Sequence, residues 1–440
     1  MRRLVRILLV RILLAIVVVI AAGVAIFLFK PAPLPDVSVA AAKLPTGQAL
    51  IERGEYLTRA ADCAACHTTS GGQPYAGGLA FKLPFGTVYS PNITADKETG
   101  IGNWSDAEFV RALHQGIDSQ GRNLYPAFSY AAYARMTTED ALAIKAYLFS
   151  LPPVHAEAPK NDLSFPFNQR YVLRFWNLLF VPDGPLSQDE KQSAEWNRGA
   201  YLVEAMAHCG ECHTPRNLLY GLDNGKKFAG AELQGWKAYN ISSDKTTGIG
   251  SWSDEQLFDY LSKGHADGRG SATGSMGEAV DYSLRHLTPE DIKAIVAYVK
   301  TVPPQTSSDK AIVEAEPPAT LTTSIAYAPS ADSVAQSGLG LKLFQGACAS
   351  CHGWNGEGLQ TPYAALRGSR TVNDPDGTNL IQVILKGAHM TTPLGKQAMP
   401  AFANAYSDVE IAALGNYVLA HFGGKQSAIT PADVAKARMQ

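Results

Sequence analysis

The sequence has few charged residues and no cysteine outside a short paired motif. Charged residues make up 18% of the 440 residues, and 38 basic against 40 acidic side chains give a net charge of −2. No basic patch stands out, so a nucleic-acid partner is not expected. We find no polar–apolar alternation of the kind that predicts half-buried strands. We also identify no flavin, pyrroloquinoline quinone or molybdopterin site, so substrate chemistry is expected on another chain.

The six cysteines form three pairs, and a histidine directly follows each pair. The motifs consist of Cys63, Cys66 and His67; Cys209, Cys212 and His213; and Cys348, Cys351 and His352. Because every cysteine belongs to a motif, a general disulfide framework is disfavoured. Thiols at i and i+3 share one helical face and can add to two vinyl groups on a haem edge, while the histidine reaches the iron. The pattern predicts three covalent haem c groups.

Zinc and a redox dithiol are the alternative interpretations of this motif. Structural zinc takes four nitrogen or sulfur ligands, whereas each motif offers two cysteines and one histidine. A thioredoxin-type pair follows a strand in a βαβ unit, which the sequence does not show. Haem c is therefore the preferred interpretation.

Methionine is the expected sixth ligand of an electron-transferring haem c. Met206 precedes Cys209 by three residues on the proximal side and should not reach the distal face. For the first haem, ligation by His114 or an open position is the alternative. For the third, Met390 is the alternative. By elimination the expected iron ligands are Met136, Met276 and Met399, the last in a Met-Pro loop.

Five further residues are candidate haem contacts. Asn92 and Trp104 recur as Asn240 and Trp252 in a second copy of the same loop. Packing within the loop and contact with haem are equally open for these four. Arg216 is a candidate partner for a haem propionate.

An internal repeat sets the expected domain organisation. Residues 99–106 read TGIGNWSD and residues 247–254 read TGIGSWSD, with further matches on both sides. Such self-similarity indicates two copies of one domain, and a shorter third unit follows. The expected parts are a membrane anchor (1–30), a first cytochrome c domain (45–155), an apolar docking or linker segment (156–190), a second domain (191–305), a linker (306–335) and a third domain (336–424).

The N-terminus resembles a transmembrane anchor. Residues 12–29 are uncharged, and 18 residues of helix span about 27 Å, close to the hydrocarbon thickness of a bilayer. Four arginines precede the span, which predicts a cytoplasmic N-terminus. A cleaved signal is the alternative, but its apolar core would be shorter and would end in a small-residue cleavage site.

The expected fold is all-α, with three cytochrome c-type domains in tandem behind the anchor. Helices are predicted over 50–61, 106–115 and 138–151, and helical patterns over 340–344 and 410–421. Residues 156–190 are too apolar for a plain linker. One interpretation is that this segment packs between domains. The other is that it docks to a partner or to the membrane.

Several longer motifs resemble one family, the tri-haem cytochrome c subunits of membrane-bound bacterial dehydrogenases. They are residues 165–168 (FPFN), 176–180 (WNLLF), 196–203 (WNRGAYLV) and 212–217 (CHTPRN). The resemblance implies that this chain takes electrons from a large catalytic subunit and passes them through its three haems to ubiquinone. It also implies a small subunit as a further partner. It also implies haem domains in the periplasm, held at the bacterial inner membrane.

Two features depart from the alcohol-oxidising members of that family. Residues 127–130 read AFSY where those members often read Ala-Met-Pro-Tyr, and the anchor is expected to be retained. Both features resemble members paired with molybdenum hydroxylases, such as aldehyde dehydrogenases. A freestanding membrane-anchored carrier, or a haem peroxidase-like enzyme with chemistry at the first haem, are the competing functions.

Overall fold

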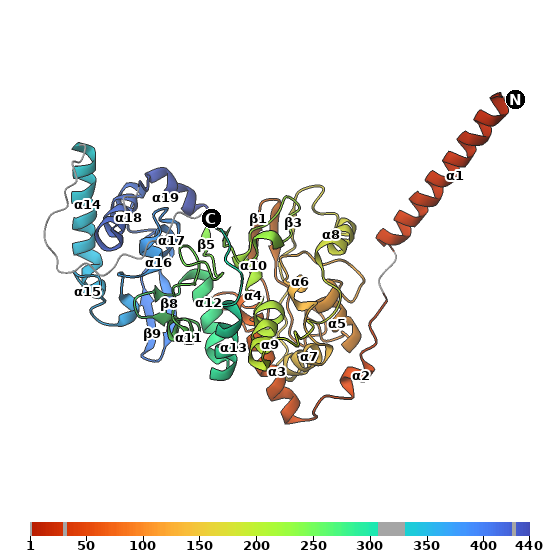
Figure 1. Cartoon of the computed structure of the whole chain (residues 1–440), viewed down its shortest axis with the longest axis horizontal. Helices are drawn as coiled ribbons and strands as arrows, with labels where there is room; N and C mark the ends of the chain where they lie inside the picture. Colours follow the sequence, from red (N-terminus) through yellow and green to blue (C-terminus); the bar gives the residue numbers. More distant parts are fainter. Residues whose placement is uncertain (1, 30–32, 307–330, 425–427) are drawn as a thin grey trace. The chain divides into compact units, whose positions relative to one another are not determined.

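A computed structural model of the chain describes residues 2–29, 33–306, 331–424 and 428–440 (Figure 1). The described residues are mostly helical and form two compact units. The first unit comprises Met1–Gly54 and Thr69–Pro185, and the second comprises Glu55–Thr68 and Leu186–Gln440. The second and third expected domains therefore pack within one unit, together with the first Cys-x-x-Cys-His motif.

The first unit contains the candidate membrane helix and a small helical body with one sheet. Its helices are α1 (Arg2–Phe29), α2 (Ser38–Ala41), the beginning of α3 (Gln48–Ala60), α5 (Asp106–Gln115), α6 (Tyr130–Tyr133), α7 (Thr138–Ser150), the short 3₁₀ helix η1 (Arg170–Val172) and α8 (Leu173–Phe180). Ser105 and Glu108 form a capping box that starts α5, and Gly116 ends it in the left-handed conformation. Thr137 caps α7. The predicted helices 106–115 and 138–151 thus match α5 and α7 closely.

Short strands are present that the sequence did not lead us to expect. In the first unit β1 (Ala80–Leu83), β2 (Gly86–Tyr89) and β3 (Asp162–Leu163) form an antiparallel sheet. The loops of the second unit contain three two-stranded sheets. Their strands are β4 (Ala231–Leu233), β5 (Trp236–Ala238), β6 (His265–Ala266), β7 (Gly270–Ser271), β8 (Ala388–Thr392) and β9 (Gly395–Met399). Strands of two to five residues are too short to show a clear alternation.

The second unit is helical around these sheets. Its elements are the end of α3, α4 (Cys63–His67), α9 (Ala194–Tyr201), the π-helix η2 (Leu202–Met206), α10 (Gly210–His213), η3 (Asn224–Lys226), α11 (Asp254–Lys263), α12 (Gly274–Tyr282), η4 (Leu284–His286), α13 (Pro289–Val299), α14 (Ala331–Ala347), α15 (Ala349–His352), η5 (Pro362–Ala364), α16 (Arg370–Asn373), α17 (Thr378–Lys386), α18 (Asp408–Gly423) and α19 (Pro431–Arg438).

Three helix pairs cross in the same manner, each with a glycine at the contact. A Cβ added to Gly54 would lie 2.1 Å from the Ala143 oxygen. A Cβ added to Gly199 would lie 1.8 Å from the Ala294 oxygen, and one added to Gly340 would lie 2.3 Å from the Ala413 oxygen. Only a residue without Cβ permits backbones to approach this closely. The crossings join α3 to α7, α9 to α13 and α14 to α18. In each case, the helix that enters a cysteine motif meets the last long helix of its repeat.

An ion pair accompanies the first two crossings. Arg53 contacts Asp140 at 2.6 Å in the first unit, and Arg198 contacts Asp291 at 2.6 Å in the second. The Tyr56 hydroxyl also donates to Asp291 Oδ2, at 2.5 Å. The sequence repeats Arg-Gly at 53–54 and 198–199 and Glu-Asp at 139–140 and 290–291, and these segments form the two sides of one type of helix–helix contact.

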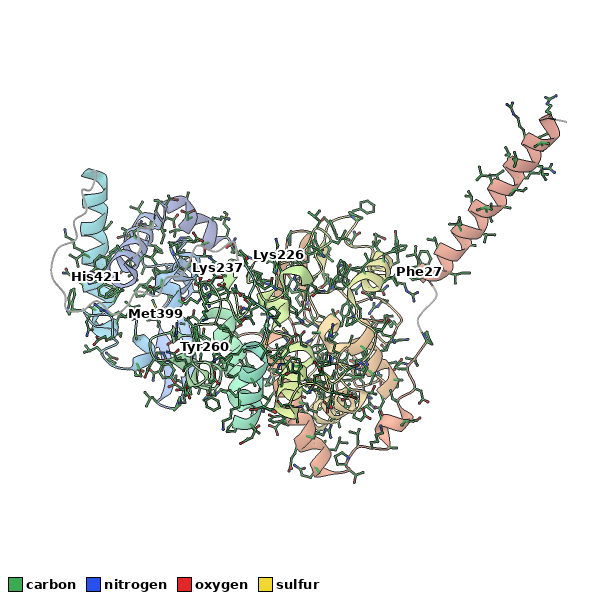
Figure 2. The ribbon with its side chains drawn as sticks, viewed as in Figure 1. Phe27, Lys226, Lys237, Tyr260, Met399 and His421 are labelled. Atoms are coloured by element: carbon green, nitrogen blue, oxygen red, sulfur yellow. The ribbon has the colours of Figure 1, made fainter. Side chains whose placement is uncertain are left out.

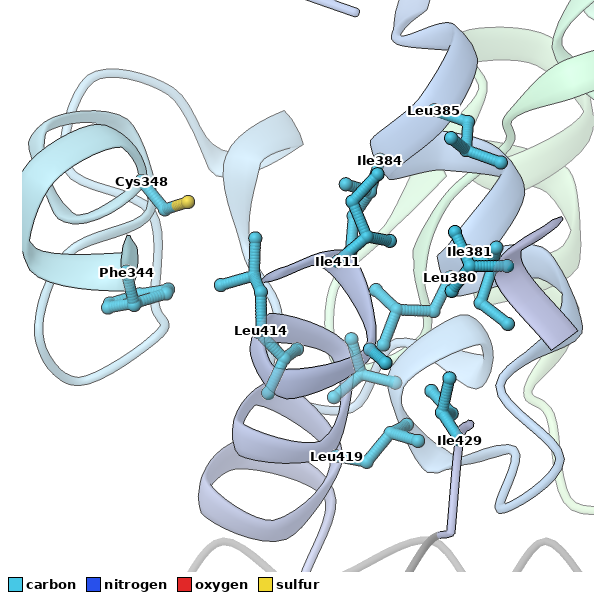
Figure 3. Packing of buried hydrophobic residues seen from close by; sticks show 14 of the residues in the cluster. Phe344, Cys348, Leu380, Ile381, Ile384, Leu385, Ile411, Leu414, Leu419 and Ile429 are labelled. Atoms are coloured by element: carbon cyan, nitrogen blue, oxygen red, sulfur yellow. The ribbon is translucent and has the colours of Figure 1, made fainter. Parts of the chain in front are cut away.

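The third crossing closes an apolar core (Figure 3). Phe344, Cys348 and Leu414 belong to this cluster, together with Ile429 and Val434. The packing thus continues past residue 424, where we placed the end of the third domain. Helix α14 begins at Ala331, inside the expected linker 306–335. Residues 307–330 of that linker lie outside the described residues.

Candidate haem sites

Each Cys-x-x-Cys-His motif lies on one short helical turn. The motifs coincide with α4, α10 and α15. The amide of His213 donates to the Cys209 carbonyl, and that of His352 donates to the Cys348 carbonyl, both at 3.0 Å. A turn of this kind places the two sulfurs on one side, as attachment along a single haem edge requires. No disulfide joins any of the six cysteines, all of which lie in the described part of the chain.

Two of the motif histidines are held by a backbone carbonyl. Nδ1 of His213 lies 2.6 Å from the Tyr239 oxygen, and Nδ1 of His352 lies 2.6 Å from the Ala364 oxygen. A histidine that ligates a metal usually donates its other ring N–H in this way, which fixes the tautomer and ring direction. Nδ1 is then the donor and Nε2 remains for the iron. Burial lowers the pKa of both rings, which favours the neutral form that a metal needs.

The structure does not support the zinc interpretation. Among the described parts of the chain, no three His, Cys, Asp or Glu side chains converge as a metal-ligand set. The donor set of each motif, two neighbouring thiols and one oriented imidazole, instead fits a covalently attached haem.

The second unit holds two of the three candidate methionine ligands. Met276 lies half-buried on α12. Met399, marked in Figure 2, lies in β9 and packs against the apolar cluster that contains Cys348. The alternative ligand, Met390, lies beside Gly264 instead. A Cβ added to that glycine would lie 2.3 Å from the Met390 sulfur. This arrangement favours Met399 over Met390 near the third motif, and ligation itself stays a prediction.

The first unit holds Met136 and His114. Met136 is fully buried in the turn before α7. His114 lies in the last turn of α5, where burial lowers its pKa to about 4. Its Nε2 is buried without a partner among the described residues. Because Cys63 and His67 pack in the second unit, the sixth ligand of the first haem also stays a prediction.

Met206 is packed in the core of the second unit. It is fully buried in the π-helix η2, which leads into the motif at Cys209. Its exclusion as an iron ligand stays a prediction.

The repeated asparagines clamp their loops. Asn92 donates to Thr99 Oγ1 and the Val154 oxygen, and its own oxygen accepts from the amide and hydroxyl of Thr94. Asn240 makes the equivalent contacts in the second unit. Both side chains are buried, so their polar atoms are satisfied within the loop. The geometry favours the packing interpretation, and a haem contact of either residue stays a prediction.

The other three candidate contacts are also tied to protein groups. The carbonyl of Trp104 accepts from Lys145 Nζ at 2.8 Å. Trp252 is buried beside Tyr260, with ring centroids 5.3 Å apart. Arg216 donates to the Glu211 carboxylate at 2.7 Å. Contact of these residues with haem remains a prediction.

The first two motifs lie close together within the second unit. Helix α4, which carries the first motif, packs against α12, the helix of Met276. Burial raises the pKa of the Cys66 thiol, and the neighbouring Asp62 and Cys212 raise it further. Because such Coulombic effects fall off with distance, Cys66 and Cys212 lie within electrostatic range of each other.

Sequence reasoning missed Arg370. This residue begins α16, and its guanidinium carbon lies 4.7 Å from the centre of the Tyr239 ring. It also donates to the Asn240 oxygen at 3.3 Å and to the Thr247 oxygen. The positive charge therefore lies beside the segment whose carbonyl orients His213. No local signal in the sequence could have revealed this contact, because Arg370 follows the third motif and the loop follows the second.

These features define a c-type cytochrome, in which covalent haem is held by Cys-x-x-Cys-His turns. Comparisons with known proteins agree. The cytochrome c family matches residues 51–152, and the family described as cytochrome c oxidase, cbb3-type, subunit III matches residues 336–418.

Several curated relatives resemble nearly the whole chain. The fructose dehydrogenase cytochrome subunit of Gluconobacter japonicus is 41% identical over 399 residues, covering 88% of this chain and 82% of that protein. The gluconate 2-dehydrogenase cytochrome c subunit of Pantoea cypripedii is 36% identical, covering 89% and 90%. A nicotinate dehydrogenase chain of Pseudomonas putida is 40% identical, but the match covers only 31% of that protein. The chain belongs to the family of cytochrome c subunits of fructose, gluconate and alcohol dehydrogenases.

Proposed function

We propose that this chain is the electron-transfer subunit of a membrane-bound dehydrogenase complex. It accepts electrons from a large catalytic subunit, accompanied by a small subunit, and relays them through three haem c groups to ubiquinone. The observation that carries the proposal is the thrice-repeated Cys-x-x-Cys-His turn, two of whose histidines are oriented by a backbone carbonyl.

The three helix crossings support three cytochrome c domains, one for each haem. Each domain would hold its haem by two cysteines and one histidine, with methionine as the sixth ligand. Haem bound in this manner supplies reversible one-electron chemistry. The role of the chain is to orient the imidazole, exclude water and place neighbouring sites close together, and the proximity of the first two motifs serves that last purpose.

The N-terminal helix supports attachment to the bacterial inner membrane. Val5–Phe29 has a mean hydropathy of 3.3 and no buried side chains in its most apolar window. Arginines 2, 3, 6 and 11 precede or begin this span. Because positive charges stay on the cytoplasmic side, we propose that the haem domains lie in the periplasm.

A molybdenum-containing partner that oxidises aldehydes is the preferred catalytic subunit. The observations that favour it are Phe128 and Ser129, at positions where alcohol-oxidising members of the resembled family often read Met-Pro, and the apolar N-terminal helix. A partner that oxidises alcohols or sugars is the alternative.

Mass spectrometry of the complex in mild detergent tests the proposal. We expect one chain carrying three haem masses together with a large catalytic chain, whose identity names the substrate class. The double variant Cys348→Ala with Cys351→Ala is the matched control and should carry two haem masses while retaining the partner. A lone chain with intact haem would instead indicate a freestanding carrier, and peroxide turnover by that lone chain would indicate an enzyme.

A further inference from the structure

An apolar face is exposed on η1 and α8, in the first unit. Its side chains are Tyr171, Val172, Phe175, Leu178 and Leu179, with exposed fractions from 38% for Tyr171 to 70% for Leu178. The intervals between these residues are those of a single helical face. Two further aromatic residues, Phe165 and Phe167, are exposed just before it, Phe165 to 79%.

The opposite face of α8 is fixed to the body of the first unit. The hydroxyl of Tyr130 donates to Asn177 Oδ1 at 2.7 Å, and Asn177 Nδ2 donates to the Gln115 oxygen at 3.0 Å. Trp176 meets the Tyr130 ring edge-on, with centroids 5.9 Å apart. Because these contacts fix the rotation of α8, its apolar face cannot turn inward.

The exposed face is continuous with the end of the candidate membrane helix. The ring of Phe27 lies 5.2 Å from that of Phe175, and the ring of Phe29 lies 5.4 Å from that of Tyr171. Phe27, marked in Figure 2, belongs to the last turns of α1. Residues that contact the end of a membrane-spanning helix lie at the level of the lipid headgroups, where aromatic side chains are favoured.

The charges around this face suit a bilayer surface. Residues 163–182 contain two arginines, Arg170 and Arg174, and no acidic residue. The guanidinium of Arg174 lies 5.4 Å from the Phe27 ring centre, at the junction with α1. The Arg170 guanidinium donates to the Asn123 carbonyl of the body at 2.8 Å, so Arg174 is the basic side chain at this face. A cation beside an exposed apolar face favours a surface of anionic lipids.

We propose that residues 165–179 form an interfacial membrane-binding surface, with the apolar face of α8 inserted among the lipids beside the anchor. The inference rests on the proposed membrane attachment through α1. It assigns the exposed part of the apolar segment 156–190 to lipid instead of to a protein partner. The consequence is that the first haem domain is held against the bilayer by a second contact.

Labelling of single introduced cysteines in nanodiscs tests this surface. The full haem-loaded chain with Leu178→Cys is compared with Leu359→Cys, a control whose leucine is 71% exposed beside the third motif. The probe is a charged, membrane-impermeant maleimide, and the parent chain corrects for background. In nanodiscs containing anionic lipid, we expect Leu178→Cys to react at least tenfold more slowly than the control. After denaturation the two rates should be equal.

Two other outcomes would overturn the proposal. Equal labelling rates in nanodiscs would show that α8 lies in water. Protection that appears only when the catalytic subunit is added would assign the face to that partner. Carbonate extraction of the membranes is measured in parallel, because release of the chain there would show instead that the α1 anchor has failed.

Discussion

The change Asn240→Ala separates the loop-clamping role of this residue from a role in haem binding. The Asn240 amide donates to Thr247 Oγ1 and the Gln305 oxygen, both at 2.9 Å. Its oxygen accepts from the amide of Ser242 at 2.8 Å and from its hydroxyl at 2.7 Å. Alanine removes all of these bonds and leaves their partners in a fully buried place.

The expected cost follows from these bonds. At about 1 kcal/mol for each buried hydrogen bond, their loss lowers the free energy of unfolding of the second unit by about 4 kcal/mol. That is a large part of the 5–15 kcal/mol or so that stabilises a typical domain. Asn224 is exposed in η3, so Asn224→Ala should change stability by no more than about 0.5 kcal/mol.

Urea denaturation of the haem-loaded chain, followed by haem absorption and by tryptophan fluorescence, measures the difference. We expect Asn240→Ala to unfold at lower urea, with reduction potentials of the native protein close to those of the parent. An unchanged transition with a shifted potential would refute the reasoning and assign Asn240 to haem.

Three further predictions concern the second unit. Met399→Ala should convert one haem from a low-spin to a high-spin spectrum through loss of a ligand, whereas Met390→Ala should leave all spectra unchanged and only weaken packing. Arg370→Gln should lower the potential of the second haem in a redox titration, because loss of a nearby cation favours the oxidised state. A tenfold change in the equilibrium between oxidised and reduced haem shifts the reduction potential by about 59 mV. Gly340→Ala should destabilise the third crossing by about 1–3 kcal/mol in denaturation, since the new Cβ would meet the Ala413 oxygen. Gly346→Ala, with open space at its Cβ in the same helix, should be neutral or stabilising.

Each of these predictions has a contradicting outcome. A spectral change in the Met390 variant would exchange the roles of the two methionines. An unchanged potential after loss of Arg370 would show that its charge is screened from the haem. Equal stability of the two glycine variants would mean that the close helix contact is not required.

Local patterns in the sequence were enough to predict the helices whose first residues include a capping side chain. Ser105 with Glu108, and Thr137 before α7, are caps that can be read directly, and the predicted bounds there match closely. The helical turn of each cysteine motif was likewise predicted from the spacing of its residues alone. In these cases the interactions that decide the structure lie within a few residues of each other.

Contacts between distant segments could not be predicted in this way. The repeat identified Asn92 and Asn240, but their roles depend on the Val154 and Gln305 carbonyls, which lie outside the motif. Arg370 reaches a loop more than a hundred residues earlier in the chain. Helix α19 packs on the third core although the preceding helical pattern had already ended.

The glycine crossings also bear on how the protein is made. In each crossing, the helix before a cysteine motif packs against a helix made only after the whole intervening loop. During synthesis, a cysteine motif therefore emerges well before the segment that will close its core. This delay leaves the thiols accessible for haem attachment until the crossing helix closes each core.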